Sequence, residues 1–225
     1  MRRGVVFDLD GVLVMSEHLW EEAWQQYAVD FRYAWTAGDT RHCQGLSVPE
    51  WGAYLADRSS GDVEDAAEVV ISLVIGAYDG GRVALIDGAA DAVAEAASRG
   101  PVGLASSAPR AVIDTALRTM GCGRFFSATV SSAEVPRGKP SPDVYLEAIR
   151  RLGIDPSGSV GIEDSSNGVR AAAAAGLTVI AVTHEAYPLD PDAIALADSV
   201  QHSLDRVGDE IVRLLNEPPI GAGTQ

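Results

Sequence analysis

Apolar and polar residues follow two different spacings along this chain. A short β-branched run begins at Val5 and ends in a turn at Gly11, which is typical of a buried strand. Four similar runs follow at 102–105, 127–131, 160–162 and 178–182, each preceded by a stretch with helix-period apolar residues. This alternation predicts an α/β fold, a Rossmann-like doubly wound parallel sheet with helices on both faces.

The stretch between the first two predicted strands has a different pattern. Apolar residues recur at helical spacing over 17–33, 48–57 and 63–78, and no strand pattern is found among them. All four tryptophans lie here, and their helical spacing indicates that most of them pack in a core. We therefore expect an α/β core from 1–14 and 85–215, a helical cap inserted over 15–84, and a disordered tail over 216–225.

Composition narrows the choice of partner and compartment. The 225 residues include 32 acidic and 17 basic side chains, and the net charge of −15 argues against nucleic acid and anionic membranes as partners. No apolar run reaches the roughly 20 residues of a membrane span, and the first residues lead directly into a strand, so we expect a cytoplasmic protein. We expect a monomer or a weak homo-oligomer. Cys43 and Cys122 match no metal or redox spacing.

Two carboxylates stand at the end of the first predicted strand. Asp8 and Asp10 are two residues apart, so in an extended backbone both side chains point the same way. Two neighbouring negative charges are unfavourable unless a cation or a proton stabilises them. Because a solvated turn could also carry two aspartates, this pair alone only suggests a metal site.

Other predicted strands also end in reactive side chains. Ser106 and Ser107 follow the second strand, and Glu163 and Asp164 follow the fourth. The carboxyl ends of parallel strands meet at one edge of a sheet, where ligands bind in such folds. Lys139, the only lysine of the chain, lies on a loop that can reach the same edge. The structural alternatives are helix capping by the serines, an acidic helix start and a surface lysine.

Four segments of the chain resemble the four motifs of the haloacid dehalogenase superfamily. They are Asp-Leu-Asp-Gly-Val at 8–12, Leu-Ala-Ser-Ser at 104–107, Gly-Lys-Pro-Ser-Pro-Asp at 138–143 and Gly-Ile-Glu-Asp-Ser at 161–165. The order and spacing resemble the branch with a helical cap after the first motif, which contains sugar-phosphate phosphatases and β-phosphoglucomutase. Four motifs in order are far more specific than any one of them.

The resemblance implies a role for each motif residue. Asp8 would attack phosphorus and form an aspartyl-phosphate, while Asp10 would protonate the leaving alcohol and later activate water. Ser106 would bind a phosphoryl oxygen, and Lys139 would offset negative charge. Mg²⁺ prefers oxygen ligands. The implied ligands are Asp8, the backbone carbonyl of Asp10, Glu163 and Asp164.

The resemblance also separates related activities. Dehalogenases lack an aspartate at the position of Asp10, so phosphoryl transfer is favoured. β-Phosphoglucomutase-like proteins carry histidine, lysine and arginine about where Trp20, Gln44 and Val48 stand here. We therefore expect a phosphatase acting on a small phosphorylated metabolite. A mutase is the second hypothesis, and a regulatory domain that binds phosphate or metal without turnover is the third.

Substrate specificity would rest on residues outside the four motifs. The candidates for substrate binding are Ser107, Arg110, Glu17, Trp20 and Gln44. Each has a structural alternative, namely a helix cap for Ser107, packing in the core for Trp20 and a solvated surface position for the other three. Met15 departs from the acidic residue that many relatives carry at this position.

Overall fold

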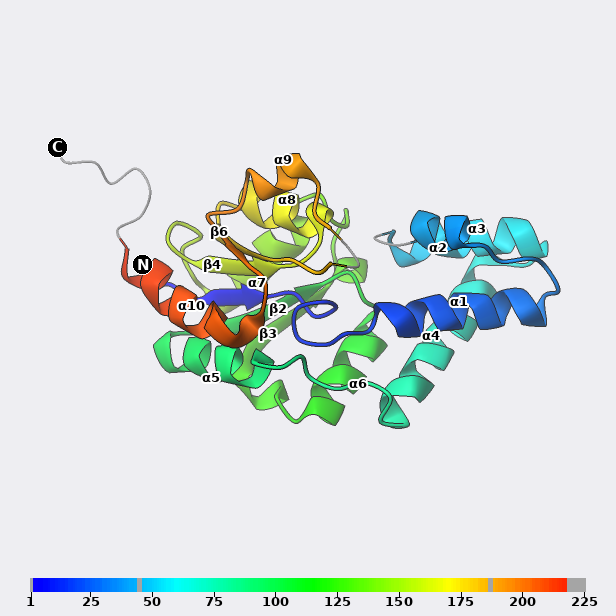
Figure 1. Cartoon of the computed structure of the whole chain (residues 1–225), viewed down its shortest axis with the longest axis horizontal. Helices are drawn as coiled ribbons and strands as arrows, with labels where there is room; N and C mark the ends of the chain where they lie inside the picture. Colours follow the sequence, from blue (N-terminus) through cyan, green and yellow to red (C-terminus); the bar gives the residue numbers. More distant parts are fainter. Residues whose placement is uncertain (1, 44–45, 186–187, 218–225) are drawn as a thin grey trace.

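A single parallel sheet forms the centre of the computed structural model, which describes residues 2–43, 46–185 and 188–217 (Figure 1). Its six strands are arranged in the order β3-β2-β1-β4-β5-β6. They are β1 (Val5–Phe7), β2 (Val102–Ser106), β3 (Phe126–Ser131), β4 (Val160–Glu163), β5 (Thr178–Val182) and β6 (Ser199–Gln201). The predicted α/β class is confirmed, and β6 is an edge strand that the apolar pattern did not indicate.

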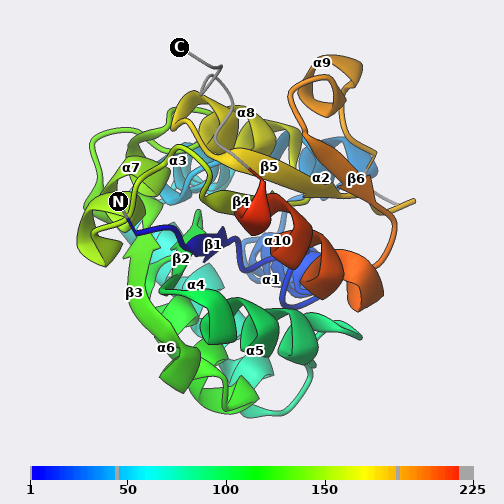
Figure 2. The same cartoon turned by 90° about the vertical axis from the view of Figure 1, so that its left-hand side faces the viewer.

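Alternation along β1 explains why helices cover both faces of the sheet. Val5 and Phe7 belong to one buried cluster and Val6 to the other, because successive side chains of a strand point to opposite faces. The first cluster includes side chains of α5 (Ala89–Arg99), α6 (Arg110–Met120) and α10 (Val207–Asn216). The second includes α7 (Asp143–Leu152), α8 (Ser166–Ala174) and α9 (Pro191–Ile194). Figure 2 shows these two groups on opposite sides of the sheet.

Four helices fill the interval for which a helical cap is expected. They are α1 (Glu17–Asp30), α2 (Ala37–Cys43), α3 (Val48–Ser59) and α4 (Val63–Asp79). Helices α1 and α3 pack on α4, which also contacts α6. The four helices lie together beyond one end of the sheet rather than over one of its faces (Figure 1). The sequence pattern predicted three of them, and α2 is an additional short helix.

The ends of these helices follow local sequence signals. Ser47 and Glu50 form a capping box at the start of α3, and Asp62 accepts a hydrogen bond from the amide of Glu64 at the start of α4. Trp24 and Trp51 are buried in the core, as their spacing predicted. Cys43 and Cys122 are buried free thiols.

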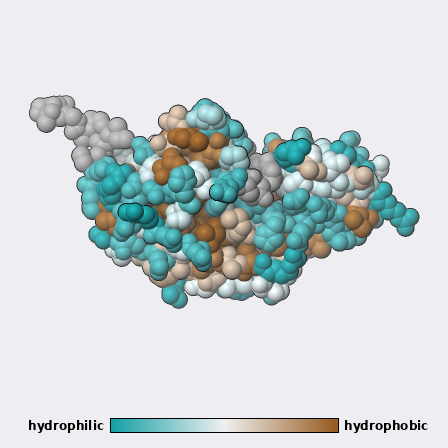
Figure 3. All heavy atoms as spheres, viewed as in Figure 1, coloured by the Kyte–Doolittle hydropathy of each residue, from teal (hydrophilic) through white to brown (hydrophobic). Residues whose placement is uncertain are grey.

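The molecular surface is mostly polar on the face drawn in Figure 3. Among the described helices, none combines the length and the apolar character needed to cross a bilayer.

Candidate active site

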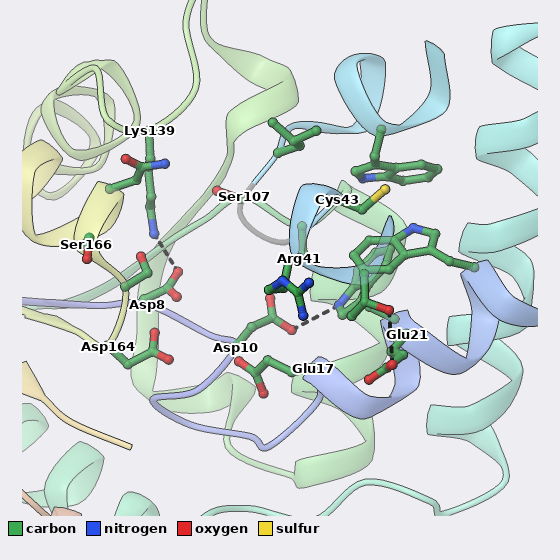
Figure 4. Close-up of a pocket in the computed structure, with 18 of the residues that line it drawn as sticks. Asp8, Asp10, Glu17, Glu21, Arg41, Cys43, Ser107, Lys139, Asp164 and Ser166 are labelled. Atoms are coloured by element: carbon green, nitrogen blue, oxygen red, sulfur yellow. Dashed lines mark hydrogen bonds and ion pairs between the residues drawn. The ribbon is translucent and has the colours of Figure 1, made fainter. Parts of the chain in front are cut away.

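Strands β1, β2 and β4 lie side by side and bring their terminal residues to one edge of the sheet. Asp8 directly follows β1, and its backbone amide donates to the Ile162 carbonyl at 3.0 Å. Ser106 ends β2 and Glu163 ends β4. The predicted meeting of the three strand ends is therefore present, and Figure 4 shows Asp8, Asp10, Lys139 and Asp164 around the same space.

Lys139 connects two of these strand ends. Its Nζ lies 2.7 Å from Asp8 Oδ1 and 2.5 Å from Glu163 Oε1, and its side chain is only 5 % exposed. Burial alone would lower the pKa of Lys139, but the charges of the two carboxylates outweigh it and raise this pKa. The raised pKa favours the charged ammonium, which contacts the Asp8 carboxylate directly.

The Glu163 carboxylate has hydrogen-bond donors on both oxygens. Oε1 accepts from Lys139 and, at 2.8 Å, from the Tyr145 hydroxyl. Oε2 accepts from the amides of Asp164 and Ser165 and from the Ser165 hydroxyl, at 3.1–3.3 Å. With five donors around it and no solvent exposure, this carboxylate is suited to hold Lys139 in place.

A cluster of carboxylates at this edge could hold a cation. Oxygens of Asp8, Glu163 and Asp164 lie within 4.8 Å of one another, and all three residues are buried. Burial, together with the neighbouring carboxylates, raises the pKa of Asp8 and of Asp164. Among the described residues, no hydrogen-bond donor reaches the Asp164 side chain. A hard divalent cation such as Mg²⁺ fits this oxygen donor set and would relieve the repulsion.

Close packing positions the Asp164 carboxylate against the turn after Asp10. Gly11 has a φ of 75°, and a Cβ at this position would overlap the Asp164 side chain. The carbonyl of Gly11 accepts a hydrogen bond from His184 Nε2 at 2.6 Å. Glycine is required here both for the left-handed backbone and for the close approach.

Asp10 has a hydrogen-bond environment distinct from that of Asp8. Its Oδ1 accepts from the Ser16 hydroxyl and from Trp20 Nε1 at 3.5 Å, and its Oδ2 accepts from Ser106 Oγ at 3.5 Å. Burial raises the pKa of Asp10, and the donors from Ser16 and Trp20 only partly offset this effect. A carboxyl with a raised pKa can carry the proton that an acid catalyst needs.

The Ser106 hydroxyl serves two local partners. Besides its contact with Asp10, it accepts a hydrogen bond from the amide of Ala108 at 3.0 Å. Ser106 therefore lies at the site, as predicted, and it also makes a local turn contact, which was the structural alternative. Ser107 also lines the site.

A cavity of about 920 Å³ opens between this sheet edge and helices α1 to α3. Glu17 and Trp20 line it, as predicted for substrate-binding positions. Burial and the nearby Asp10 charge raise the pKa of Glu17 to about 7. Further lining residues that the sequence did not single out for binding include Glu21, Trp24, Thr40, Arg41 and Trp51. The spacing of Glu17 and Glu21, four residues apart on one helix, could have indicated a shared face.

One predicted substrate-binding residue, Arg110, lies away from this cavity, and another falls outside the described residues. Arg110 is absent from the described lining and instead pairs with Glu134, and it also donates to the Thr129 hydroxyl at 2.6 Å. These partners hold its guanidinium beside β3. Gln44 lies outside the described residues.

Comparison with known proteins agrees with this geometry. Residues 3–176 match the haloacid dehalogenase-like hydrolase family. Hexitol phosphatase B of Escherichia coli (strain K12) is 33 % identical over 88 % of this chain and 91 % of its own length. Validoxylamine A 7'-phosphate phosphatase of Streptomyces hygroscopicus subsp. limoneus is 28 % identical over 92 % of this chain and 96 % of its own length.

Solved structures show the same architecture. CbbY from Rhodobacter sphaeroides in complex with phosphate superposes with a TM-score of 0.82 and 26 % identity, covering 92 % of this chain and 97 % of that protein. The match extends over the sheet and the inserted helices, and the four motifs of the sequence lie together at one sheet edge. The chain therefore belongs to the haloacid dehalogenase-like hydrolase family.

Proposed function

We propose that this protein is a Mg²⁺-dependent phosphatase that hydrolyses a small phosphorylated metabolite of the sugar-phosphate class through an aspartyl-phosphate intermediate. The observation that carries the proposal is the buried contact of Lys139 with Asp8, next to a second aspartate with a raised pKa. The relatives support the substrate class, since they include the hexitol phosphatase and a phosphorylated carbohydrates phosphatase of Thermotoga maritima.

Asp8 is the proposed nucleophile. Its Oδ1 accepts the Lys139 hydrogen bond, and no donor among the described residues reaches Oδ2. An ionised carboxylate oxygen needs no base to attack phosphorus, and the Lys139 ammonium favours this ionised form by opposing the rise in the Asp8 pKa that burial causes. The new bond joins Asp8 to phosphorus while the bond from phosphorus to the leaving oxygen breaks.

Asp10 is the proposed acid and base. Its carboxyl proton passes to the leaving oxygen as the alcohol departs, which leaves a carboxylate. That carboxylate then takes a proton from the water that attacks the aspartyl-phosphate and releases inorganic phosphate. Ser16 and Trp20 fix the orientation of this side chain.

Asp8, Asp164 and the backbone carbonyl of Asp10 are the residues that would hold Mg²⁺. When bound, the cation would offset the charge of the phosphoryl oxygens and of the carboxylates around them. We assign Glu163 to holding Lys139, because its oxygens already accept five hydrogen bonds. This assignment revises the ligand set that the sequence resemblance implied.

Helices α1 to α4 are proposed to act as the cap over this site. The cavity lies between them and the sheet edge, so the leaving group of a bound substrate would contact α1, α2 and α3. Closure of the helices over the substrate would exclude water until the alcohol has left.

A mutase remains the second hypothesis. A putative β-phosphoglucomutase from Thermotoga maritima shares the fold with a TM-score of 0.74 and 26 % identity. Trp20 stands about where such proteins carry histidine, and an indole N–H is only a hydrogen-bond donor, so it cannot act as an acid or a base at neutral pH. A domain that only binds phosphate is disfavoured by Asp10, which such a domain does not need.

Hydrolysis of p-nitrophenyl phosphate and of a phosphometabolite panel with Mg²⁺ tests the proposal. We expect Asp8→Asn to abolish phosphate release and Asp10→Asn to lower kcat by roughly 10²–10⁴-fold, the usual contribution of an acid or base. Activity near that of the wild type in either variant would refute the assigned roles. Formation of a sugar bisphosphate from a hexose 1-phosphate would favour the mutase.

A further inference from the structure

The cavity has a second half, which the chemistry at the sheet edge does not use. This half is formed by α1, α2 and α3 and is lined by Glu21, Arg41 and three tryptophans, while Glu17 lies where this half meets the sheet edge, near Asp10 (Figure 4). If the proposed phosphatase activity is correct, the phosphoryl group lies against Asp8 and the leaving group occupies this half. The side chains that line this half therefore indicate which leaving groups can bind there.

Two polar atoms of the cavity-lining side chains are unpaired. Glu17 Oε2 and Trp24 Nε1 are fully buried, and neither has a hydrogen-bond partner among the described residues. Buried polar atoms nearly always have a partner, so each of these atoms requires an explanation. A hydroxyl group can satisfy both kinds of atom, because it donates to a carboxylate and accepts from an indole N–H.

The three indoles give the same half of the cavity an apolar wall. The Trp20 ring lies 6.3 Å from that of Trp24 and 6.2 Å from that of Trp51, measured between centroids. Trp24 and Trp51 are buried, whereas Trp20 is partly exposed. Apolar walls with a few placed polar groups are typical of small-molecule sites, and a flat indole offers a large apolar surface against which a ligand ring can pack.

Charge limits the class of leaving group. Six carboxyl side chains belong to the described lining of the whole cavity, whereas the only two basic side chains in that described lining are Lys139 and Arg41. Lys139 is bound to Asp8 and Glu163, and Arg41 forms no ion pair with a described residue. Figure 4 shows the Arg41 guanidinium in the same part of the cavity as the Glu17 and Asp10 side chains. One guanidinium beside several carboxylates matches hydroxyl groups, which both donate and accept, better than a second phosphate.

We propose that the leaving group is an uncharged polyhydroxylated ring, that Glu17 determines specificity by accepting a hydrogen bond from a ring hydroxyl, and that the partly exposed Trp20 indole contacts the apolar face of the ring. Substrates with a second anionic group are poor because the Glu21 carboxylate and the ionised form of Glu17 repel them. This inference rests on the proposed phosphatase activity and deepens it.

Glu17→Leu and Glu17→Gln test the proposal on three substrates with Mg²⁺. These are the best hexopyranose or cyclitol monophosphate of a panel, its bisphosphate, and phenyl phosphate, which has no hydroxyl on its leaving group. We expect the wild type to favour the monophosphate over the bisphosphate at least tenfold in kcat/KM. Glu17→Leu should lower kcat/KM for the polyol monophosphate at least tenfold more than for phenyl phosphate. Glu17→Gln keeps an acceptor oxygen, so its kcat/KM for the polyol monophosphate should lie between those of the wild type and Glu17→Leu.

The matched control is Glu22→Gln on the same helix. Glu22 is exposed and pairs with Arg82, outside the cavity lining, so its variant should behave as the wild type on all three substrates. Equal losses on the polyol and on phenyl phosphate in Glu17→Leu would overturn the proposal, since a merely structural role lowers both. A preference for the bisphosphate that disappears in Arg41→Ala would overturn it as well.

Binding separates this inference from the proposed activity. Quenching of the indole fluorescence by the polyol phosphate should occur in the wild type and weaken at least tenfold in Glu17→Leu. Binding of this kind without phosphate release would overturn the phosphatase proposal alone. Polyol binding that is unchanged in Glu17→Leu would overturn the inference.

Discussion

Replacement of Lys139 by methionine is the sharpest test of the site, because methionine keeps an apolar stem of similar length and removes the charge together with its hydrogen-bond donors. In the wild type the ammonium lies 2.7 Å from Asp8 Oδ1 and 2.5 Å from Glu163 Oε1. Glu163 is fully buried and Asp8 is 6 % exposed. The variant therefore leaves two carboxylates in the interior without their cation.

The size of the effect follows from this burial. Removing one partner of a buried ion pair costs about 3–5 kcal/mol of unfolding free energy. For a chain of 225 residues, each kcal/mol lowers Tm by roughly 2–4 °C, so we expect a Tm lower by about 6–20 °C at pH 7.5. Because burial raises the pKa of Asp8, acidification to pH 5 favours its neutral form, so the difference in Tm from the wild type should narrow.

Thermal unfolding of the metal-free protein at both pH values measures this difference. The matched control is Arg137→Met, on the same loop, whose ion pair with Asp143 involves an arginine side chain that is 71 % exposed. Solvent screens this pair, so the control should unfold close to the wild type. A Lys139→Met variant with the Tm of the control, or with measurable phosphate release, would refute the role given to Lys139.

Three further predictions address the metal, the close packing and the excluded arginine. Mg²⁺ should raise Tm more at pH 7.5 than at pH 5. The pKa values of Asp8 and Asp164 are raised, so the metal-free fold loses stability as pH rises above their ordinary value of 3.8, and the cation offsets the charges that cause this loss. An equal shift of Tm at both pH values would contradict the ligand assignment. Gly168→Ala should lower both Tm and kcat despite a helix-propensity gain of about 1 kcal/mol, because its Cβ would overlap the buried carboxylate at the end of β4, whereas Gly76→Ala has open space around it and should raise Tm. Urea unfolding and phosphatase assays of both variants check this contrast, which would be wrong if they behaved alike. Arg110→Ala should keep kcat/KM within about threefold of the wild type on the best substrate, because the partners of Arg110 lie beside β3. A larger loss would indicate that Arg110 does contact the substrate.

Local patterns determined most of the fold. Apolar runs and helical spacing identified five of the strands and most of the helices of the sheet region, and the rule that parallel strands share their carboxyl edge brought Asp8, Ser106 and Glu163 together. β6 escaped prediction because Ser199–Gln201 is short and carries two polar residues. It is a strand only because its backbone pairs with β5.

The family, too, was recognisable from the chain alone, because each motif is a short segment with a distinct spacing. The contacts of each motif residue could not be predicted from the chain alone. Glu163 could ligate a metal or hold a cation, and we propose the second because Lys139 and Tyr145 both donate to its carboxylate in the fold. Arg110 could reach the site along the sequence, but in the fold Glu134 and Thr129 hold it elsewhere.

The leaving-group half of the cavity depends entirely on tertiary structure. Glu17 and Trp20 come from α1, Arg41 from α2 and Trp51 from α3, so no sequence window contains them together. Hydrophobic periodicity and motif spacing are local properties, and they specify the elements and the reacting carboxylates. Side-chain pairing, burial and the pKa shifts that follow from them arise only when distant segments pack, and these decided what the two aspartates of the first motif can do.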